Sequence, residues 1–389
     1  MENRSDRLED NRFKEIKRLK KKNVPHQLHW FLKDDYFSEE LLGVYIFELQ
    51  NYKQTSEEAF YLFEKATDKI IQNNDLEVLG IPSFFHECII HSWNNRIKHP
   101  FLYGRFDING GLGNNNAKII EFNADTCTTI PETVVWQKLQ HNELKGNSEQ
   151  FNSLALEIGN TLTKLKSTIN HSEPFILGSS FGYKEDILNV NCILDIAYDQ
   201  GYKSFYVNLE EVIFSQEQGI LYEINGEYQI ADIWFKMIPW DWMFNEEPQL
   251  AKDLSVIITK NLCTVLNPAY TAIWQNKKFM AYITKHFPNN VIAETFSKKP
   301  LSESYVSKPC YGRLGESISI MGKINTSTKG DFSEQETIFQ KYYPLAKDLE
   351  NYYYQVGIFY SNNACALNLR SQESKIITDD CEFMSHYVI

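Results

Sequence analysis

A turn rich in glycine and asparagine, between two short segments of alternating polarity, most constrains how this chain can fold. The turn covers residues 109–116 (NGGLGNNN), and the flanking segments are residues 104–108 (GRFDI) and 118–123 (KIIEFN). Glycine and asparagine favour tight turns because they tolerate positive φ. Alternation of polar and apolar residues is typical of a strand with one buried face. The sequence therefore predicts a β-hairpin over residues 104–123.

Polar side chains of this hairpin form a candidate site for a metal and a phosphate. Strand side chains two residues apart point to the same face, so Glu121 and Asn123 share a face. In a suitable register, Arg105 and Asp107 of the other strand meet them. Two carboxylates and an amide oxygen suit Mg²⁺ held between protein and phosphates, and a guanidinium suits phosphate. A hairpin whose polar face meets only water has the same spacing, so both interpretations stay open.

Arg105 is the candidate for contact with a phosphorylated group. A buried arginine needs an anionic partner. Because a metal would occupy the carboxylates of the hairpin, we expect phosphate to be the partner of Arg105.

Composition excludes several classes of protein. The 389 residues suffice for two or three packed domains. No apolar run approaches 18 residues, so no membrane-spanning helix is expected, and the charged N-terminus lacks the apolar core of an export signal. Seven scattered cysteines without CxxC spacing predict a reduced, cytoplasmic protein without disulfides or structural zinc. The net charge of -12 disfavours a nucleic-acid partner.

The segments around the hairpin are mainly helical in pattern. Residues 1–25 are highly charged and predict a solvated helix or arm. Residues 56–73 have the spacing of an amphipathic helix, with Ser56 as a plausible N-cap, and the mixed segment of residues 82–93 is expected to pack beside it. Residues 130–133 (IPET) resemble a helix start, so the backbone of the preceding turn could hold a carboxylate. Ordinary helix capping explains that turn equally well.

A β-α-β unit follows. A buried strand at residues 174–180, a helix over residues 185–200 ended by Gly201, and a strand at 205–209 predict a small parallel sheet. Glu185 and Asp186 begin the helix at the carboxyl end of the first strand, where open α/β sheets place ligands. Acidic residues at a helix start also occur for dipole reasons alone.

The C-terminal third carries a second candidate phosphate site. Tyr305–Pro309 resembles a strand that ends at Lys308, and the glycine-bearing loop 312–317 would let backbone amides approach a phosphate. This loop is neither a P-loop nor a Rossmann fingerprint. Residues 339–344 predict a strand leading into a hinge, and residues 353–359 and 365–370 predict further strands.

Seven motifs in order resemble the glutathionylspermidine synthase family over residues 80–389. They are RFD…KIIEFNADT, KEDILN, FKMIPWDWMF, QNKKFM, SKPCYGRLGES, FQKYYPL and LNLRSQES. The resemblance implies an α+β fold of the ATP-grasp type, with the metal hairpin before the nucleotide lysines. It also implies a ligase that joins a carboxylate to an amine with ATP and Mg²⁺, through an acyl phosphate. The chain resembles the shorter members of the family, which lack the cysteine amidase domain.

The resemblance also implies roles for individual residues. Mg²⁺ would be bound by Asp107, Glu121 and Asn123, and Arg105 would steady the transferred phosphoryl group. ATP would be bound by Lys277, Lys308, the lid-loop residues Gly312, Arg313 and Gly315, and Gln340 at the adenine hinge. Substrates would be bound by Thr126, Thr128, Glu185, Asp186 and Arg370. The turn NADTCTT has Cys127 where the family has proline, at the position expected for a thiol peptide.

Together these observations predict three segments. Residues 1–100 would form a mainly helical region, 101–260 the hairpin and α/β substrate region, and 261–389 the nucleotide-binding region. The expected partners are a small-molecule or short-peptide carboxylate and an amine, with polyamines among the candidates, and neither nucleic acid nor membrane. A non-catalytic nucleotide- or peptide-binding homologue is the alternative.

Overall fold

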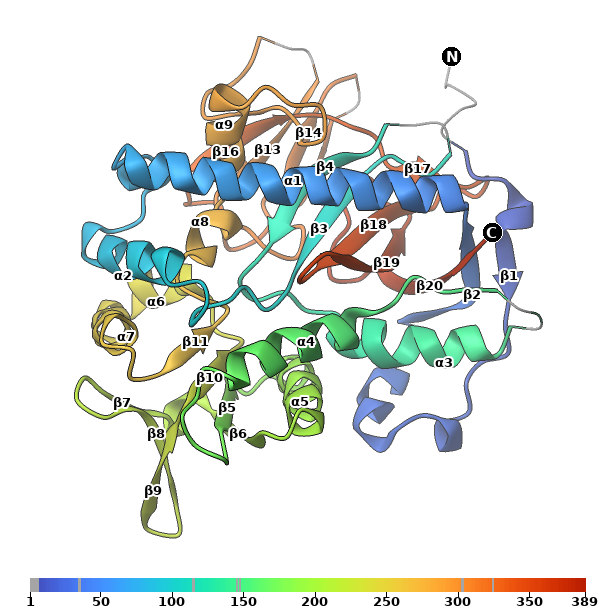
Figure 1. Cartoon of the computed structure of the whole chain (residues 1–389). Coiled ribbons are helices and arrows are strands. Elements are labelled where there is room, and N and C mark those ends of the chain that lie inside the picture. The colour runs from blue at the N-terminus through green and yellow to red at the C-terminus, as the bar shows by residue number, and fades with distance from the viewer. Residues whose placement is uncertain are drawn as a thin grey trace.

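The computed structural model of this chain describes residues 7–33, 36–113, 116–144, 146, 148–301, 304–323 and 325–389. Figure 1 shows the hairpin strands in the middle of the molecule, beside strands from the C-terminal end of the chain. The described strands form an eight-stranded, a four-stranded, a five-stranded and a three-stranded sheet.

The eight-stranded sheet joins the two ends of the chain to the hairpin. Its strands, in spatial order, are β1 (Phe13–Glu15), β2 (Phe37–Val44), β20 (Glu382–Val388), β19 (Ala364–Gln372), β18 (Tyr353–Tyr360), β3 (Gly104–Asn109) and β4 (Lys118–Asn123), with β17 (Ala346–Lys347) paired to β18. Strands β2 and β20 run parallel, and the other neighbours are antiparallel. Strands β3, β4, β18 and β19 were predicted, whereas the sequence analysis did not identify β1, β2 or β20.

Helices cover both faces of this sheet. The long helix α1 (Ile46–Gln72) contacts β4, β18 and β19 on one face, where Phe63 packs edge-on against Phe106 and Phe122 of the hairpin. The π-helical turn η6 (Glu132–Trp136), α3 (Gln137–Asn142) and α4 (Leu154–Lys166) contact β19 or β20 on the other face. Because Phe106 points toward α1, its neighbours Arg105 and Asp107 point to the opposite face.

The predicted start of the amphipathic helix was wrong. Helix α1 begins ten residues before the predicted start, so Ser56 lies fully buried inside it and is not an N-cap. Instead, Glu48 in the first turn accepts a hydrogen bond from the backbone of Tyr45. The described part of the charged segment, residues 7–25, contains β1 and short 3₁₀ turns but no α-helix, because buried Arg12 pairs with Glu48 and β1 adds to the sheet edge. Residues 1–6 of the predicted helix or arm lie outside the described residues. Short 3₁₀ turns complete this region: η2 (Asp10–Arg12), η3 (Lys21–Asn23), η4 (His26–Lys33) and η5 (Leu76–Leu79).

The predicted β-α-β unit is confirmed as part of an all-parallel sheet. Its strands, in spatial order, are β11 (Thr264–Leu266), β10 (Ile233–Lys236), β5 (Phe175–Ser180) and β6 (Lys203–Asn208). Helix α5 (Lys184–Asp199) connects β5 to β6 and ends before Gly201, whose φ is +78°. The turn η7 (Leu209–Glu211) leads to a three-stranded sheet of β7 (Ile213–Ser215), β8 (Gly219–Ile224) and β9 (Glu227–Ala231).

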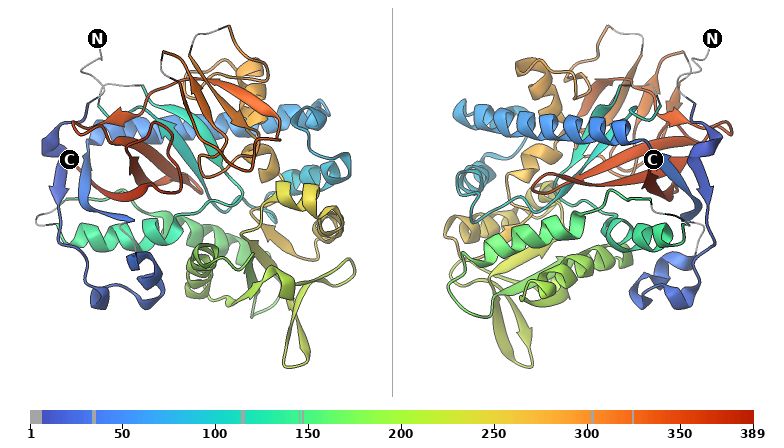
Figure 2. Two further views of the ribbon diagram at one scale, coloured as in Figure 1. Left: turned by 180° about the vertical axis from the view of Figure 1, so that it is seen from behind. Right: turned by 45° about the vertical axis from the view of Figure 1, so that its right-hand side comes forward.

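The five-stranded antiparallel sheet lies next to the hairpin. Its strands, in spatial order, are β12 (Thr295–Phe296), β16 (Thr337–Lys341), β13 (Tyr305–Pro309), β14 (Ser319–Met321) and β15 (Thr326–Ser327). Seen from behind, its orange strands stand beside the strands of the eight-stranded sheet (Figure 2). The remaining helices are α2 (Ser83–Asn94), α6 (Trp240–Glu246), α7 (Pro248–Thr259), α8 (Thr271–Gln275) and α9 (Lys277–His286).

The molecule is thus a mixed α/β protein, and the mixed segment of residues 82–93 forms most of α2. The eight-stranded sheet draws strands from all three predicted segments, whose boundaries stay a prediction. No helix within the described ranges is long and apolar enough to cross a membrane.

Candidate active site

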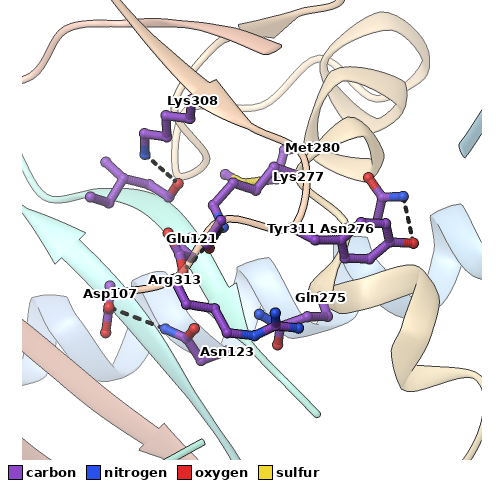
Figure 3. Close-up of polar contacts among 12 residues, drawn as sticks. Asp107, Glu121, Asn123, Gln275, Asn276, Lys277, Met280, Lys308, Tyr311 and Arg313 are labelled. Atoms are coloured by element: carbon purple, nitrogen blue, oxygen red, sulfur yellow. Dashed lines mark hydrogen bonds and ion pairs between the residues drawn. The ribbon is translucent and has the colours of Figure 1, made fainter. Parts of the chain in front are cut away.

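The hairpin has the register on which the candidate site depends. Arg105 lies opposite Asn123, and Asp107 lies opposite Glu121, as the shared face requires. The amide of Asn123 donates a hydrogen bond of 3.1 Å to Asp107 (Figure 3). The strands and their facing polar side chains are therefore confirmed. Residues 114 and 115 of the predicted turn lie outside the described residues.

Asp107 is held between two arginines that come from opposite ends of the chain. The Arg105 Nε lies 2.6 Å from one carboxylate oxygen of Asp107, and the Arg370 Nη2 lies 2.6 Å from the other. Burial alone would raise the pKa of Asp107, but the two guanidinium groups outweigh burial and lower it to about 2. In the structure Arg105 therefore pairs with Asp107, and its expected contact with a phosphorylated group stays a prediction.

The turn after the hairpin positions Arg105. Its Nη1 donates to the hydroxyl of Thr129 at 2.9 Å and to the carbonyl of Thr128 at 3.3 Å. Thr129 has a φ of +67° and also accepts a hydrogen bond from Asn368 of β19 at 2.9 Å. Thr126 and Thr128 lie half-buried in this turn. Thr129 belongs to the turn predicted at a helix start, although only Thr126 and Thr128 of that turn were predicted site residues.

Gly357 of β18 leaves the space that Arg105 occupies. It pairs with Asp107 across the sheet. A β-carbon at this position would lie 2.6 Å from the Arg105 Cδ and would also collide with the side chain of Asn368. Glycine is thus required here by packing rather than by backbone conformation, which is why no local sequence signal identified it.

Two buried lysines approach the same hairpin from the C-terminal third (Figure 3). Lys277, the first residue of α9, lies 3.4 Å from Glu121 and donates to the carbonyl of Gly312 at 2.8 Å. Lys308 of β13 donates to the carbonyl of Ile120 at 3.2 Å. The neighbouring Lys278 instead pairs with Glu336, so the two adjacent lysines point in different directions.

A β-bulge exposes the carbonyl that receives Lys308. The pairing of β3 with β4 shifts after Asp107, which leaves Ile120 without a partner residue. Gln340 of β16 donates to the same Ile120 carbonyl at 3.2 Å and to Thr295 at 3.0 Å. Burial lowers the pKa of Lys308 to about 8, although Glu121 favours the charged form. Gln340 therefore lies beside Lys308, and its predicted contact with adenine stays a prediction.

The predicted lid loop crosses from the five-stranded sheet to the neighbouring elements. Arg313 forms an ion pair with Asp241 of α6, and its Nε is buried without a hydrogen-bond partner among the described residues. Gly315 has a φ of +69°, and a β-carbon there would collide with the carbonyl of Ile377. Together with the contact of Lys277 to Gly312, these interactions hold the loop against the hairpin and the C-terminal strands.

A second acidic group lies at the start of α5. Glu185 and Asp186 begin α5, and burial raises their pKa values to about 8 and about 6. For Glu185, repulsion from Glu132, Asp379 and Asp186 adds to the effect of burial. The sequence analysis gave Glu132 no role in the site, because an acidic residue in the first turn of a helix is common.

The hairpin has the ligand chemistry for Mg²⁺ only in combination with phosphate. Asp107, Glu121 and Asn123 supply two carboxylates and one amide oxygen, all hard oxygen ligands. Within the described ranges no group of three or more His, Cys, Asp or Glu side chains is arranged to hold a metal ion. Mg²⁺ usually keeps part of its coordination for phosphates and water, so the residues present fit an ion shared with a nucleotide.

This chain is similar to a known protein family and to several known proteins. A family model described as glutathionylspermidine synthase preATP-grasp matches residues 12–389. A protein named putative acid–amine ligase from Haemophilus influenzae is 26% identical over 337 residues, which cover 82% of each chain. The bifunctional glutathionylspermidine synthetase/amidase of Escherichia coli is 22% identical over 358 residues, and the match covers 85% of this chain.

More distant matches extend the comparison. The trypanothione synthetase of Crithidia fasciculata is 20% identical over 348 residues. The matches cover only 56% of the Escherichia coli protein and 51% of the Crithidia fasciculata protein, so this chain spans about half the length of these two relatives. Among solved structures, a glutathione synthetase-like effector from Globodera pallida superposes with a TM-score of 0.58 over 91% of this chain and 90% of its own. At 10% sequence identity, this likeness shows a shared fold.

Proposed function

Because this chain belongs to the glutathionylspermidine synthase preATP-grasp family, we propose that it is an ATP-dependent ligase that joins a carboxylate to an amine. The observation that carries the proposal is the convergence of cations from distant segments on one hairpin face. Arg105 and Arg370 contact Asp107, and Lys277 contacts Glu121, with Lys308 beside them. Buried cations of this kind suit a ligand with several negative charges.

The cations use partners that a nucleotide could replace. Lys277 contacts a backbone carbonyl and one carboxylate, and Lys308 contacts a backbone carbonyl. Phosphate oxygens would offer both lysines stronger, charge-assisted hydrogen bonds than a neutral carbonyl does. We therefore assign Lys277, Lys308, Gln340 and the loop with Gly312, Arg313 and Gly315 to ATP.

The reaction proceeds in two displacements. A carboxylate oxygen of the acid substrate attacks the γ-phosphorus of ATP, the bond to ADP breaks, and an acyl phosphate forms. The amine nitrogen then attacks the acyl carbon, the carbon–oxygen bond to phosphate breaks, and an amide and inorganic phosphate are released. Arg105 and Arg370 lie where they would neutralise charge on the transferred phosphoryl group. Their fixed positions would align the reacting groups as well as attract them.

Asp107, Glu121 and Asn123 would hold Mg²⁺, which supplies positive charge to the phosphates when bound. Asp107 would then exchange part of its contact with the two arginines for the ion. This exchange would free Arg105 and Arg370 to turn toward the phosphoryl group. The low pKa of Asp107 keeps it charged, as a metal ligand must be.

The substrates are a small acid or short peptide and an amine. The turn with Thr126 and Thr128 lies beside Arg105 and would receive the acid, whereas Glu185 and Asp186 would receive the amine. Relatives named for glutathionylspermidine and trypanothione synthesis make polyamines and thiol peptides the first compounds to test. All seven cysteines are free in the structure, which is compatible with our proposal that the protein works in the cytoplasm.

Nucleotide turnover tests the proposal directly. ADP release should be measured with panels of acids, short peptides and amines, and the products should be identified by mass. Lys308→Ala should abolish nucleotide binding, with Lys278→Ala as the matched control, because Lys278 pairs with Glu336 away from the hairpin. ATP and Mg²⁺ binding without turnover across the panels would favour a non-catalytic homologue. A folded protein that binds no Mg–nucleotide would contradict the proposed function.

A further inference from the structure

Glu132 is a fully buried carboxylate, and one of its two oxygens has no hydrogen-bond partner among the described residues. It begins the π-helical turn η6, a backbone form that is frequent at functional sites. One oxygen accepts a hydrogen bond of 2.9 Å from the hydroxyl of Tyr36. The other oxygen is buried and has no hydrogen-bond partner among the described residues. A buried oxygen without a hydrogen bond costs free energy in the folded state. A ligand that donates a hydrogen bond to this oxygen would therefore bind tightly.

The structure ties Glu132 to the start of α5. The backbone N–H of Ile130 donates to Asn189 at 3.0 Å, and the amide of Asn189 donates to the carbonyl of Glu185 at 3.0 Å. This chain of hydrogen bonds holds two helix starts together and brings Glu132 near enough to Glu185 for their charges to repel.

The two helix starts carry negative charge without a matching cation. In the described part of the chain, no lysine, arginine or histidine forms an ion pair with Glu132, Glu185 or Asp186. Arg105 lies close enough to favour the charged form of Glu132, but its ion pair is with Asp107. Buried acids that repel one another and lack a cation point to a cationic ligand.

We propose that Glu132 receives the attacking primary amine: its free oxygen binds the substrate ammonium beside Glu185 and takes one proton from it. This inference rests on the proposed function, because the acyl phosphate that the amine attacks is part of that proposal. Proton transfer converts the ammonium and the Glu132 carboxylate into a free amine and a carboxylic acid. The nitrogen lone pair then bonds to the acyl carbon, phosphate departs with the electrons of the broken bond, and the second nitrogen proton leaves with phosphate. Glu132 returns its proton to solvent after the product leaves.

The environment of Glu132 suits a proton acceptor at neutral pH. Burial raises its pKa to about 7, and the hydrogen bond from Tyr36 and the charge of Arg105 keep it from rising further. A base with a pKa near the working pH is the most effective one. The titratable or charged groups that face Glu132 are Tyr36, Arg105, Cys127, Glu185 and Cys192.

Tyr36 acts as a positioning residue contributed by the N-terminal region. Its ring stacks on Phe31, and the adjacent Phe37 stacks on Trp136 with ring centroids 3.6 Å apart. Trp136 belongs to the same turn as Glu132. The N-terminal region therefore fixes both the turn and the oxygen of Glu132 that Tyr36 contacts, which leaves the other oxygen for the amine.

Amine titrations of the full chain test the inference without a known acid substrate. Thermal stabilisation by spermidine and by 1,3-diaminopropane should be measured without nucleotide, for the wild type, Glu132→Gln and the exposed control Glu210→Gln. Loss of a charge-assisted hydrogen bond should weaken binding to Glu132→Gln by about tenfold or more. Stabilisation by Mg–ATP should remain unchanged in both variants. Equal amine affinity of Glu132→Gln and the wild type, or no stabilisation of the wild type by either amine, would overturn the inference.

Further readouts separate a role in catalysis from a role in folding. With an active substrate pair, kcat/KM for the amine should rise through about pH 7 in the wild type, and this limb should vanish in Glu132→Gln. Because Tyr36 lowers the pKa of Glu132, Tyr36→Phe should move the limb to higher pH, and an unmoved limb would overturn the role of Tyr36. If Glu132→Gln does not fold, Glu185→Gln takes its place in the amine titration. Unchanged amine affinity of Glu185→Gln would overturn the inference that the ammonium binds beside Glu185. Mg–ATP stabilisation tests the proposed function separately, because it does not depend on the amine.

Discussion

Lys308→Met should make the ligand-free protein more stable while it removes nucleotide binding. Lys308 is 4% exposed, and its ammonium contacts the carbonyl of Ile120. Burial lowers its pKa from 10.5 to about 8. At pH 7 this difference corresponds to a destabilisation of roughly 3 kcal/mol from keeping the lysine charged in the folded state. Loss of the hydrogen bond to Ile120 offsets about 1 kcal/mol of the gain. We therefore expect the free energy of unfolding to rise by about 2 kcal/mol.

The lowered pKa of Lys308 also predicts how the free energy of unfolding changes with pH. Between about pH 8 and pH 10.5 the unfolded chain keeps the proton of Lys308, whereas the folded chain has lost it. Because the unfolded state then binds more protons, the stability of the wild type should rise with pH across this window. In Lys308→Met the contribution of this residue disappears, so the difference in stability between variant and wild type should shrink toward high pH.

Urea unfolding of both proteins from pH 6.5 to 10 measures the effect. The same series for Lys278→Met is the matched control, because Lys278 pairs with Glu336 instead. Mg–ATP should raise the melting temperature of the wild type and of Lys278→Met, but not of Lys308→Met. A ligand-free Lys308→Met protein that is less stable than the wild type at pH 7 would refute the reasoning. It would show that Lys308 stabilises the ligand-free fold and is not held there at a cost for nucleotide binding.

The remaining predictions concern the hairpin face. Glu121→Gln should weaken stabilisation by Mg–nucleotide more than by nucleotide with EDTA, and an equal effect in both titrations would remove Glu121 from the metal site. Arg105→Ala should lower turnover by about two orders of magnitude, with partial rescue by Arg105→Lys, which lacks the planar fork; normal turnover would make this arginine structural. Gly357→Ala should destabilise the protein by about 1–3 kcal/mol, because its β-carbon would displace Arg105, and unchanged urea unfolding would contradict this packing argument.

Local patterns predicted the elements whose two faces differ in polarity. The hairpin strands and the β-α-β unit follow from alternation, helical spacing and turn chemistry, and the structure confirms them. Ser56 was taken for an N-cap because a local pattern does not show that a buried polar residue lies inside a longer helix. The N-terminal strands were missed for a related reason: β2 depends on pairing with β20, more than 300 residues away, and β1 pairs with β2.

The sequence by itself determined the family and which residue types face each other on the hairpin, because strand alternation and motif order are local properties of the chain. Only the tertiary structure showed that Arg370 shares Asp107 with Arg105, that Gly357 makes room for that pair, and that Tyr36 leaves one oxygen of Glu132 unpaired. These relations join residues 96 to 263 positions apart. They depend on the order of strands in a sheet and on which groups burial leaves without a partner, and neither is encoded in the spacing of neighbouring residues.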